Sequence, residues 1–129
     1  MVEATDKKSL MEYRYLGNTG LRVSAISFGN MVNHLAENAQ QSLNSIVGRC
    51  LEYGINFFDT AEAYAAGLAE IQLGQAFKDL NVRREDIVVS TKLFFGTEGV
   101  FTSSNPPVNG LGLSRKHIIE GTRNSLKRL

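Results

Sequence analysis

The sequence predicts an α/β fold built on parallel strands. After an N-terminal hairpin, segments with the hydrophobic periodicity of strands and of helices alternate along the 129 residues. The strand-like runs at residues 55–58 and 86–91 are apolar on both faces, as in parallel sheets covered by helices. Neither GxGxxG nor GxxxxGK[ST] follows the first strand, where residues 27–33 read SFGNMVN. The pattern fits part of a (β/α)8 barrel or an open doubly wound sheet, and it argues against a phosphate loop of those two types.

The first elements are a hairpin and a short strand. Tyr13 and Tyr15 alternate with an arginine, and Leu21 and Val23 do the same beyond the turn-rich residues 17–20, GNTG. Strand alternation around such a turn is typical of a β-hairpin. A short buried strand is then expected over residues 25–28, ending at Gly29.

Two helices are expected next, separated by the strand at residues 55–58. The first starts near residue 39, and Gly54 provides a stop signal. Its buried face is predicted from i, i+3, i+4, i+7, i+8 spacing, which also places Cys50 in the core. That face comprises Leu43, Ile46, Val47, Cys50 and Leu51. The apolar side of the second helix comprises Ile71, Leu73, Phe77 and Leu80.

The last elements are the strand at residues 86–91, a long irregular stretch and a final helix. Residues 94–113 contain Pro106 and Pro107 and exceed the usual length of a βα loop, which favours a functional or mobile segment. Ser114 is expected to cap the final helix. The apolar side of that helix is predicted to carry Ile118, Ile119 and Leu126.

Composition and charge exclude several classes of function. Apolar residues make up 43% of the chain, charged residues 21%, and the net charge is +1, so nothing favours nucleic acid or an anionic membrane as the main partner. One cysteine and two scattered histidines provide no metal-ligand spacing. His34, His117 and the basic residues of the last helix, at 115–116 and 127–128, are expected to be solvated. The first 12 residues contain charges and no apolar run, so we expect no signal peptide and a cytoplasmic protein.

Three ionisable residues follow the carboxyl ends of predicted strands, where parallel-strand folds place their chemistry: Asp59, Tyr64 and Lys92. Each alone also suits a plain role, as a turn cap, an amphipathic loop residue or a solvated lysine. A phenol is a weak acid at neutral pH unless a cation stabilises its phenolate. Lys92 could supply that cation, Asp59 could orient it, and Tyr64 could then protonate a carbonyl oxygen while a cofactor donates hydride.

These residues lie in segments that resemble a known family. FFDTAEAY (57–64), IVVSTK (87–92) and the preceding hairpin YRYLGNTGLRVSAISFG together resemble the aldo-keto reductase superfamily. GLGLSRKHIIEGTRNSLKRL and DTAEAYAAGLAEIQLG are similar to the branch that contains the beta subunits of voltage-gated potassium channels. The resemblance implies the N-terminal portion of a (β/α)8 barrel, with a hairpin plug and about three βα units.

The resemblance also implies roles for particular residues. Asp59, Tyr64 and Lys92 match three of the family's four catalytic positions, with Tyr64 as proton donor and NADPH/NADP+ as cofactor. Asn30 and Met31, where the family usually has Thr-Trp, are implied to contact the cofactor, and so is Asp59. The implied substrate is a small aldehyde or ketone.

The resemblance covers only part of a barrel, because a full one needs about 250 residues. We expect a polar tail over residues 1–11 and, over residues 12–129, the N-terminal part of a truncated barrel domain. The leading function is NADPH-dependent carbonyl reduction. One alternative is a regulatory subunit that binds a potassium channel alpha subunit and NADP(H). Such a subunit would be peripheral to the membrane and tetrameric, as in that branch. A second alternative is a non-catalytic truncated binding protein.

Overall fold

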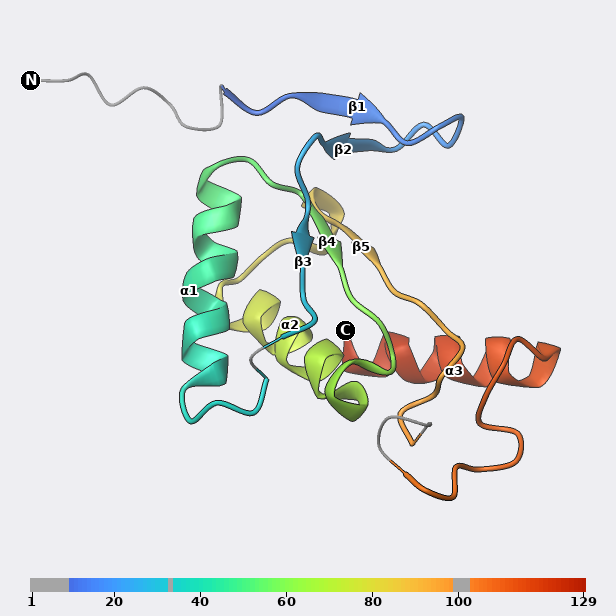
Figure 1. Cartoon of the computed structure of the whole chain (residues 1–129). Helices are drawn as coiled ribbons and strands as arrows, with labels where there is room; N and C mark the ends of the chain where they lie inside the picture. Colours follow the sequence, from blue (N-terminus) through green and yellow to red (C-terminus); the bar gives the residue numbers. More distant parts are fainter. Residues whose placement is uncertain (1–9, 33, 99–102) are drawn as a thin grey trace, which may run out of the picture.

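The hairpin and the parallel strands form two separate sheets in the computed structural model, which describes residues 10–32, 34–98 and 103–129 (Figure 1). The first nine residues of the predicted tail lie outside the described residues. The hairpin pairs β1 (Tyr13–Tyr15) antiparallel with β2 (Arg22–Ser24). The parallel sheet contains β3 (Phe28–Gly29), β4 (Phe57–Asp59) and β5 (Val88–Ser90) in chain order. Over the described residues this sheet is a portion of a barrel wall and does not close.

The hairpin is fastened to the amino-terminal end of the parallel sheet. The Tyr13 hydroxyl donates to the Gly54 carbonyl oxygen at 2.8 Å, and the Ser24 N–H donates to Asn56 Oδ1 at 2.7 Å. Both partners lie directly before β4. The hairpin therefore lies at the opposite end of the strands from Asp59 (Figure 1).

The register of the sheet decides which residues meet at its carboxyl end. Gly29 pairs with Asp59, and Asp59 pairs with Ser90, so the three strands end in one row. The strand predicted over residues 25–28 is wrong in its bounds and burial, because Ala25, Ile26 and Ser27 are exposed and only Phe28 joins β3. Residues 25–27 instead link the hairpin to the sheet.

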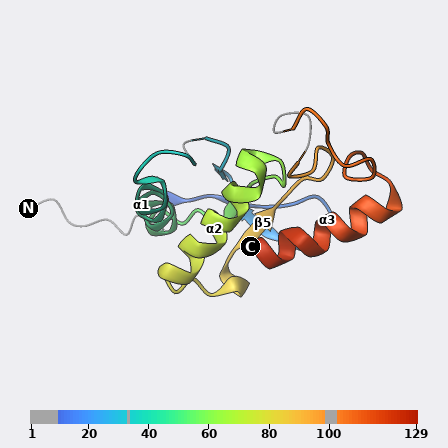
Figure 2. The ribbon, with the colours of Figure 1, turned by 90° about the horizontal axis from the view of Figure 1, so that it is seen from below.

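Two helices and the sheet enclose the core. α1 (Ala39–Glu52) and α2 (Leu68–Asp79) pack against it, and α2 lies between α1 and α3 (Figure 2). The fully buried Phe58 ring stands edge-on to Phe77 at 5.1 Å and to Phe28 at 6.1 Å between centroids. The other buried members of this core are Leu43, Val47, Leu73, Ala76 and Ile87.

Some positions on the predicted apolar faces are not buried. Ile46 of α1 and Ile71 of α2 are exposed. Cys50 is half-buried against the core, and desolvation by burial raises the pKa of its thiol. Its predicted place on the packed side of α1 is therefore correct, although its burial is incomplete.

The last helix, α3 (Arg115–Arg128), packs through a face that periodicity does not indicate. Ser114 caps it as predicted, its Oγ accepting the His117 N–H at 3.1 Å. The buried positions are His117, Gly121 and Ser125, whereas Ile118 and Leu126 are exposed, so the predicted apolar side is wrong. A Cβ on Gly121 would lie 2.9 Å from the Leu93 side chain, which explains why this face needs a small residue.

None of the helices within residues 10–32, 34–98 and 103–129 combines the length and apolar character that crossing a lipid bilayer requires.

Candidate active site

An ion pair joins the carboxyl ends of the neighbouring parallel strands β4 and β5. Asp59 is the last residue of β4 and Lys92 lies two residues beyond β5, so the register brings them to the same rim. Lys92 Nζ lies 2.7 Å from Asp59 Oδ2 and donates to the Thr60 carbonyl oxygen at 2.6 Å. The Ser90 hydroxyl donates to Asp59 Oδ1 at 2.5 Å. Both carboxylate oxygens of Asp59 thus have partners, and the ammonium group has a defined position.

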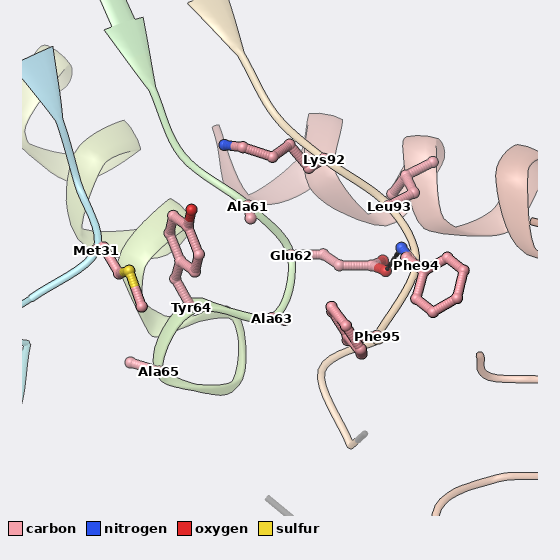
Figure 3. Close-up of a pocket in the computed structure, with 10 residues that line it drawn as sticks. All are labelled: Met31, Ala61, Glu62, Ala63, Tyr64, Ala65, Lys92, Leu93, Phe94 and Phe95. Carbon is pink, nitrogen blue, oxygen red and sulfur yellow. Dashed lines mark hydrogen bonds between the residues drawn. The ribbon is translucent and has the colours of Figure 1, made fainter. Parts of the chain in front are cut away.

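Tyr64 places its ring beside that ammonium group. Lys92 Nζ lies 5.2 Å from the centroid of the Tyr64 ring, and the phenol oxygen points to the side where Lys92 lies (Figure 3). A cation over an aromatic face is attracted by the ring's quadrupole. The structure therefore brings together the three residues that the sequence singled out.

The turn that carries Tyr64 has an unusual backbone. Tyr64 opens the 3-10 turn η2 (Tyr64–Gly67), and Ala65, Ala66 and Gly67 follow with φ values of 48°, 57° and 88°. A left-handed conformation costs an L-residue about 1–2 kcal/mol, and such strain is concentrated at functional sites. This turn holds Tyr64 at the cavity before α2 begins at Leu68.

A cavity of about 650 Å³ opens beside Tyr64 and Lys92 (Figure 3). Its walls are mainly apolar, and the Phe94 and Phe95 rings meet edge to face with centroids 4.9 Å apart. Concave, largely apolar cavities with a few polar groups are typical of small-molecule sites. The other apolar lining residues are Met31, Leu93 and the alanines at positions 61, 63 and 65.

The two residues that follow β3 have different positions relative to this cavity. Asn30 is buried: its side-chain amide donates to the Ala69 carbonyl oxygen at 2.8 Å, and its backbone N–H donates to the Asp59 carbonyl oxygen at 2.9 Å. Met31 is exposed and lines the cavity. The Met31 side chain is therefore open to a ligand, while the Asn30 amide nitrogen stabilises the junction of β3 with α2.

Both histidines are buried, which contradicts their predicted solvated role. His34 Nδ1 lies 2.6 Å from Gln72 Oε1, and its Nε2 lies 3.2 Å from the Asn30 carbonyl oxygen. His117 Nε2 lies 2.9 Å from Glu62 Oε1. Both rings are covered by residues from distant segments of the chain. The polarity of the neighbouring residues in the sequence, on which the prediction was based, carries no information about such contacts.

Two buried carboxylates near the site were missed by sequence reasoning. Glu62 and Glu70 are almost fully buried. Glu70 accepts from Thr91 Oγ1 at 2.7 Å and from Arg128 Nε at 2.6 Å, so the prediction that Arg128 is solvated is also wrong. Acidic residues seldom lie in a core unless they are paired, and the partners of Glu70 are 21 and 58 residues away in the chain. No local pattern could have identified them.

Comparison with protein families identifies the family to which these residues belong. The model of the aldo/keto reductase family matches residues 25–129, which include both halves of the Asp59–Lys92 pair and Tyr64. The chain belongs to the aldo/keto reductase family. Within the chain, the family's parallel strands are represented by β3, β4 and β5.

Relatives of this aldo/keto reductase chain include two plant proteins. Over 119 residues it is 49% identical to a probable voltage-gated potassium channel subunit beta from Arabidopsis thaliana and also 49% identical to one from Oryza sativa subsp. japonica. In each case the match covers 92% of this chain and 34% of the relative. The chain thus spans about a third of the length of these curated relatives.

Solved structures agree with this membership. The aldo-keto reductase AKR11C1 from Bacillus halodurans, in its holo form, aligns with a TM-score of 0.70 and 34% identity over 92% of this chain and 36% of that one. A putative aldo-keto reductase from Pseudomonas aeruginosa aligns with a TM-score of 0.70 and 28% identity over 91% of this chain and 41% of its own. Both likenesses support the assignment of the chain to part of a barrel.

The family generally uses NAD(P)H, and the residues at the cavity fit the nicotinamide end of such a cofactor. Asp59 is not part of the cavity lining but pairs with Lys92, which is, and its side chain is 35% exposed, so its carboxylate can accept a hydrogen bond from a ribose hydroxyl. Met31 offers apolar surface to a flat ring. Among the described residues that line the cavity, Lys92 is the only cation, so this cavity lacks the set of cations that the cofactor's phosphates would need.

Proposed function

We propose that this chain carries the proton-donor side of an NADPH-dependent carbonyl reductase site. The observation that supports the proposal best is the linked geometry of Asp59, Lys92 and Tyr64, the last two of which line an apolar cavity. Bound NADPH would supply a hydride to the carbonyl carbon. The residues of the chain would then orient the substrate and provide a proton to its oxygen.

Each side chain has a distinct part in this proposal. Tyr64 donates its phenol proton to the carbonyl oxygen, and the nearby Lys92 ammonium stabilises the resulting phenolate. Asp59 keeps the ammonium group in place through its 2.7 Å contact. The Phe94 and Phe95 rings favour a bulky apolar aldehyde or ketone over a small polar one.

The test measures NADPH oxidation with 4-nitrobenzaldehyde by the wild-type chain and by Lys92→Met. We expect turnover in the wild type and a loss of at least about tenfold in the variant, because the phenolate would lose its neighbouring cation. Lys78→Met, which removes an exposed lysine of α2, is the matched control and should leave the rate unchanged. Equal rates for wild type and Lys92→Met would remove Lys92 from the proposed role.

A second function, regulation of a potassium channel, is favoured by the names of the two plant relatives. In that case a channel alpha subunit would be the partner, and the cavity would bind NADP(H) with little turnover. Co-purification of the chain with the cytoplasmic domain of a voltage-gated potassium channel tests this function. A complex that forms at micromolar concentration would support it, and its absence at that concentration would contradict it.

A further inference from the structure

Glu62 is a buried carboxylate that ties three segments together. It is only 2% exposed. Its Oε1 accepts the Phe94 N–H at 2.9 Å (Figure 3). The same oxygen accepts the Gly96 N–H at 2.8 Å and lies 2.9 Å from His117 Nε2. Hydrogen bonds to a carboxylate are shorter and stronger than those between neutral groups. The carboxylate thus joins the loop after β4, the loop after β5 and α3.

The two joined loops are those that carry the proposed chemistry. Glu62 lies two residues before Tyr64, and Phe94 lies two residues after Lys92. The backbone adds a further connection, because the Glu62 N–H donates to the Lys92 carbonyl oxygen at 3.1 Å. A change at Glu62 would therefore alter how the turn of Tyr64 sits against the loop of Lys92.

His117, which does not line the cavity, contacts Glu62, which does. The His117 side chain is 8% exposed and the Glu62 side chain 3%, so their contact is shielded from water. Gly121, one turn further along α3, brings the helix close: a Cβ there would lie 3.1 Å from Glu62 Oε2. Removing the imidazole would leave the buried carboxylate without one of its hydrogen-bonding partners.

We propose that Glu62, held by His117, is a positioning residue for the Tyr64–Lys92 pair. It sets the separation of the two loops so that the phenol and the ammonium stay adjacent, and it acts through them without contributing a proton itself. The proposal rests on the proposed reductase function. Its catalytic consequence follows from the steep dependence of rate on geometry, since a misplacement of about 1 Å can cost about a hundredfold.

The kinetic test uses Glu62→Gln, which keeps the shape and one acceptor oxygen but removes the charge. We expect kcat with NADPH and 4-nitrobenzaldehyde to fall about tenfold, with KM for the aldehyde changed less than about twofold. In a Tyr64→Phe background, Glu62→Gln should add little, because its effect passes through Tyr64. Full additivity of the two losses, or an unchanged kcat, would overturn the proposal.

Two further variants separate positioning from a general loss of structure. His117→Gln leaves Glu62 in place and should give the same pattern as Glu62→Gln, in smaller degree. Glu120→Gln removes an exposed carboxylate of the same helix and should leave kcat unchanged. If Glu120→Gln matched the effect of Glu62→Gln, the special place of Glu62 would be disproved.

Hydrogen exchange followed by mass spectrometry gives a readout that does not need turnover. In Glu62→Gln and His117→Gln we expect faster exchange in residues 93–97, where Glu62 binds amides, and also in residues 64–67, where it binds none. If the wild-type chain fails to oxidise NADPH, the reductase proposal fails and exchange alone decides the role of Glu62. Unchanged exchange at residues 64–67 would then overturn it.

Discussion

Replacing Tyr64 with phenylalanine is expected to lower the rate of aldehyde reduction by about a hundred to ten thousand times, the usual contribution of a positioned general acid or base. The substitution removes one oxygen atom and leaves the ring beside Lys92, so the cavity keeps its shape. The loss should appear in kcat rather than in the affinity for NADPH. The rate of NADPH oxidation at saturating aldehyde measures kcat, and a separate titration of NADPH binding measures the affinity.

The control for this prediction is Tyr15→Phe. Tyr15 lies in β1, on the hairpin at the other end of the strands, and it is exposed. Its variant should reduce aldehydes at the wild-type rate. Turnover by Tyr64→Phe equal to that of the wild type would remove Tyr64 as proton donor and would favour the reading of the cavity as a regulatory cofactor site.

Replacing Arg128 with methionine is expected to lower the free energy of unfolding by about 3–5 kcal/mol. Glu70 is fully buried in α2, and Arg128 Nε lies 2.6 Å from its carboxylate. Methionine restores apolar volume but provides no charge, so the carboxylate would stay in the core with only the Thr91 hydroxyl as a partner among the contacts described. Urea denaturation followed by circular dichroism measures the change.

Two matched variants make this stability prediction specific. Lys127→Met changes the exposed neighbour of Arg128 and should alter stability by less than about 0.5 kcal/mol. Adding Glu70→Gln to Arg128→Met should recover part of the loss, because a neutral amide is less costly to bury than a charge. A loss in Arg128→Met no larger than that in Lys127→Met would contradict the importance of the buried pair.

Much of the fold could be predicted because its signals are local. The alternation of apolar residues with arginine on either side of a glycine-rich turn indicated β1 and β2. The helical spacing of Leu43 and Val47 indicated α1. The order of the elements then placed Asp59 at the end of a parallel strand. Strand register brings Asp59 close to Lys92, since residues that end neighbouring parallel strands meet at one edge of the sheet.

The errors concern surfaces whose partners lie far away in the chain. Ile118 and Leu126 have helical spacing, yet α3 turns His117, Gly121 and Ser125 inward because it packs against the carboxylates of Glu62 and Glu70. Periodicity reports where apolar residues recur and carries no information about a buried charge elsewhere. The burial of His34 could not be predicted because its side-chain partner, Gln72, lies 38 residues away in the chain.

By itself, the sequence determined the order of strands and helices, the cap at Ser114 and the three residues at the rim, because each depends on neighbours within a few positions or on the end of a strand. Only the tertiary structure decided which carboxylates are buried and which face of α3 packs. Glu62 meets His117 across 55 residues, and Glu70 meets Arg128 across 58. Such pairs form because burying a carboxylate without a partner costs free energy, and the partner can come from any segment that the fold brings close.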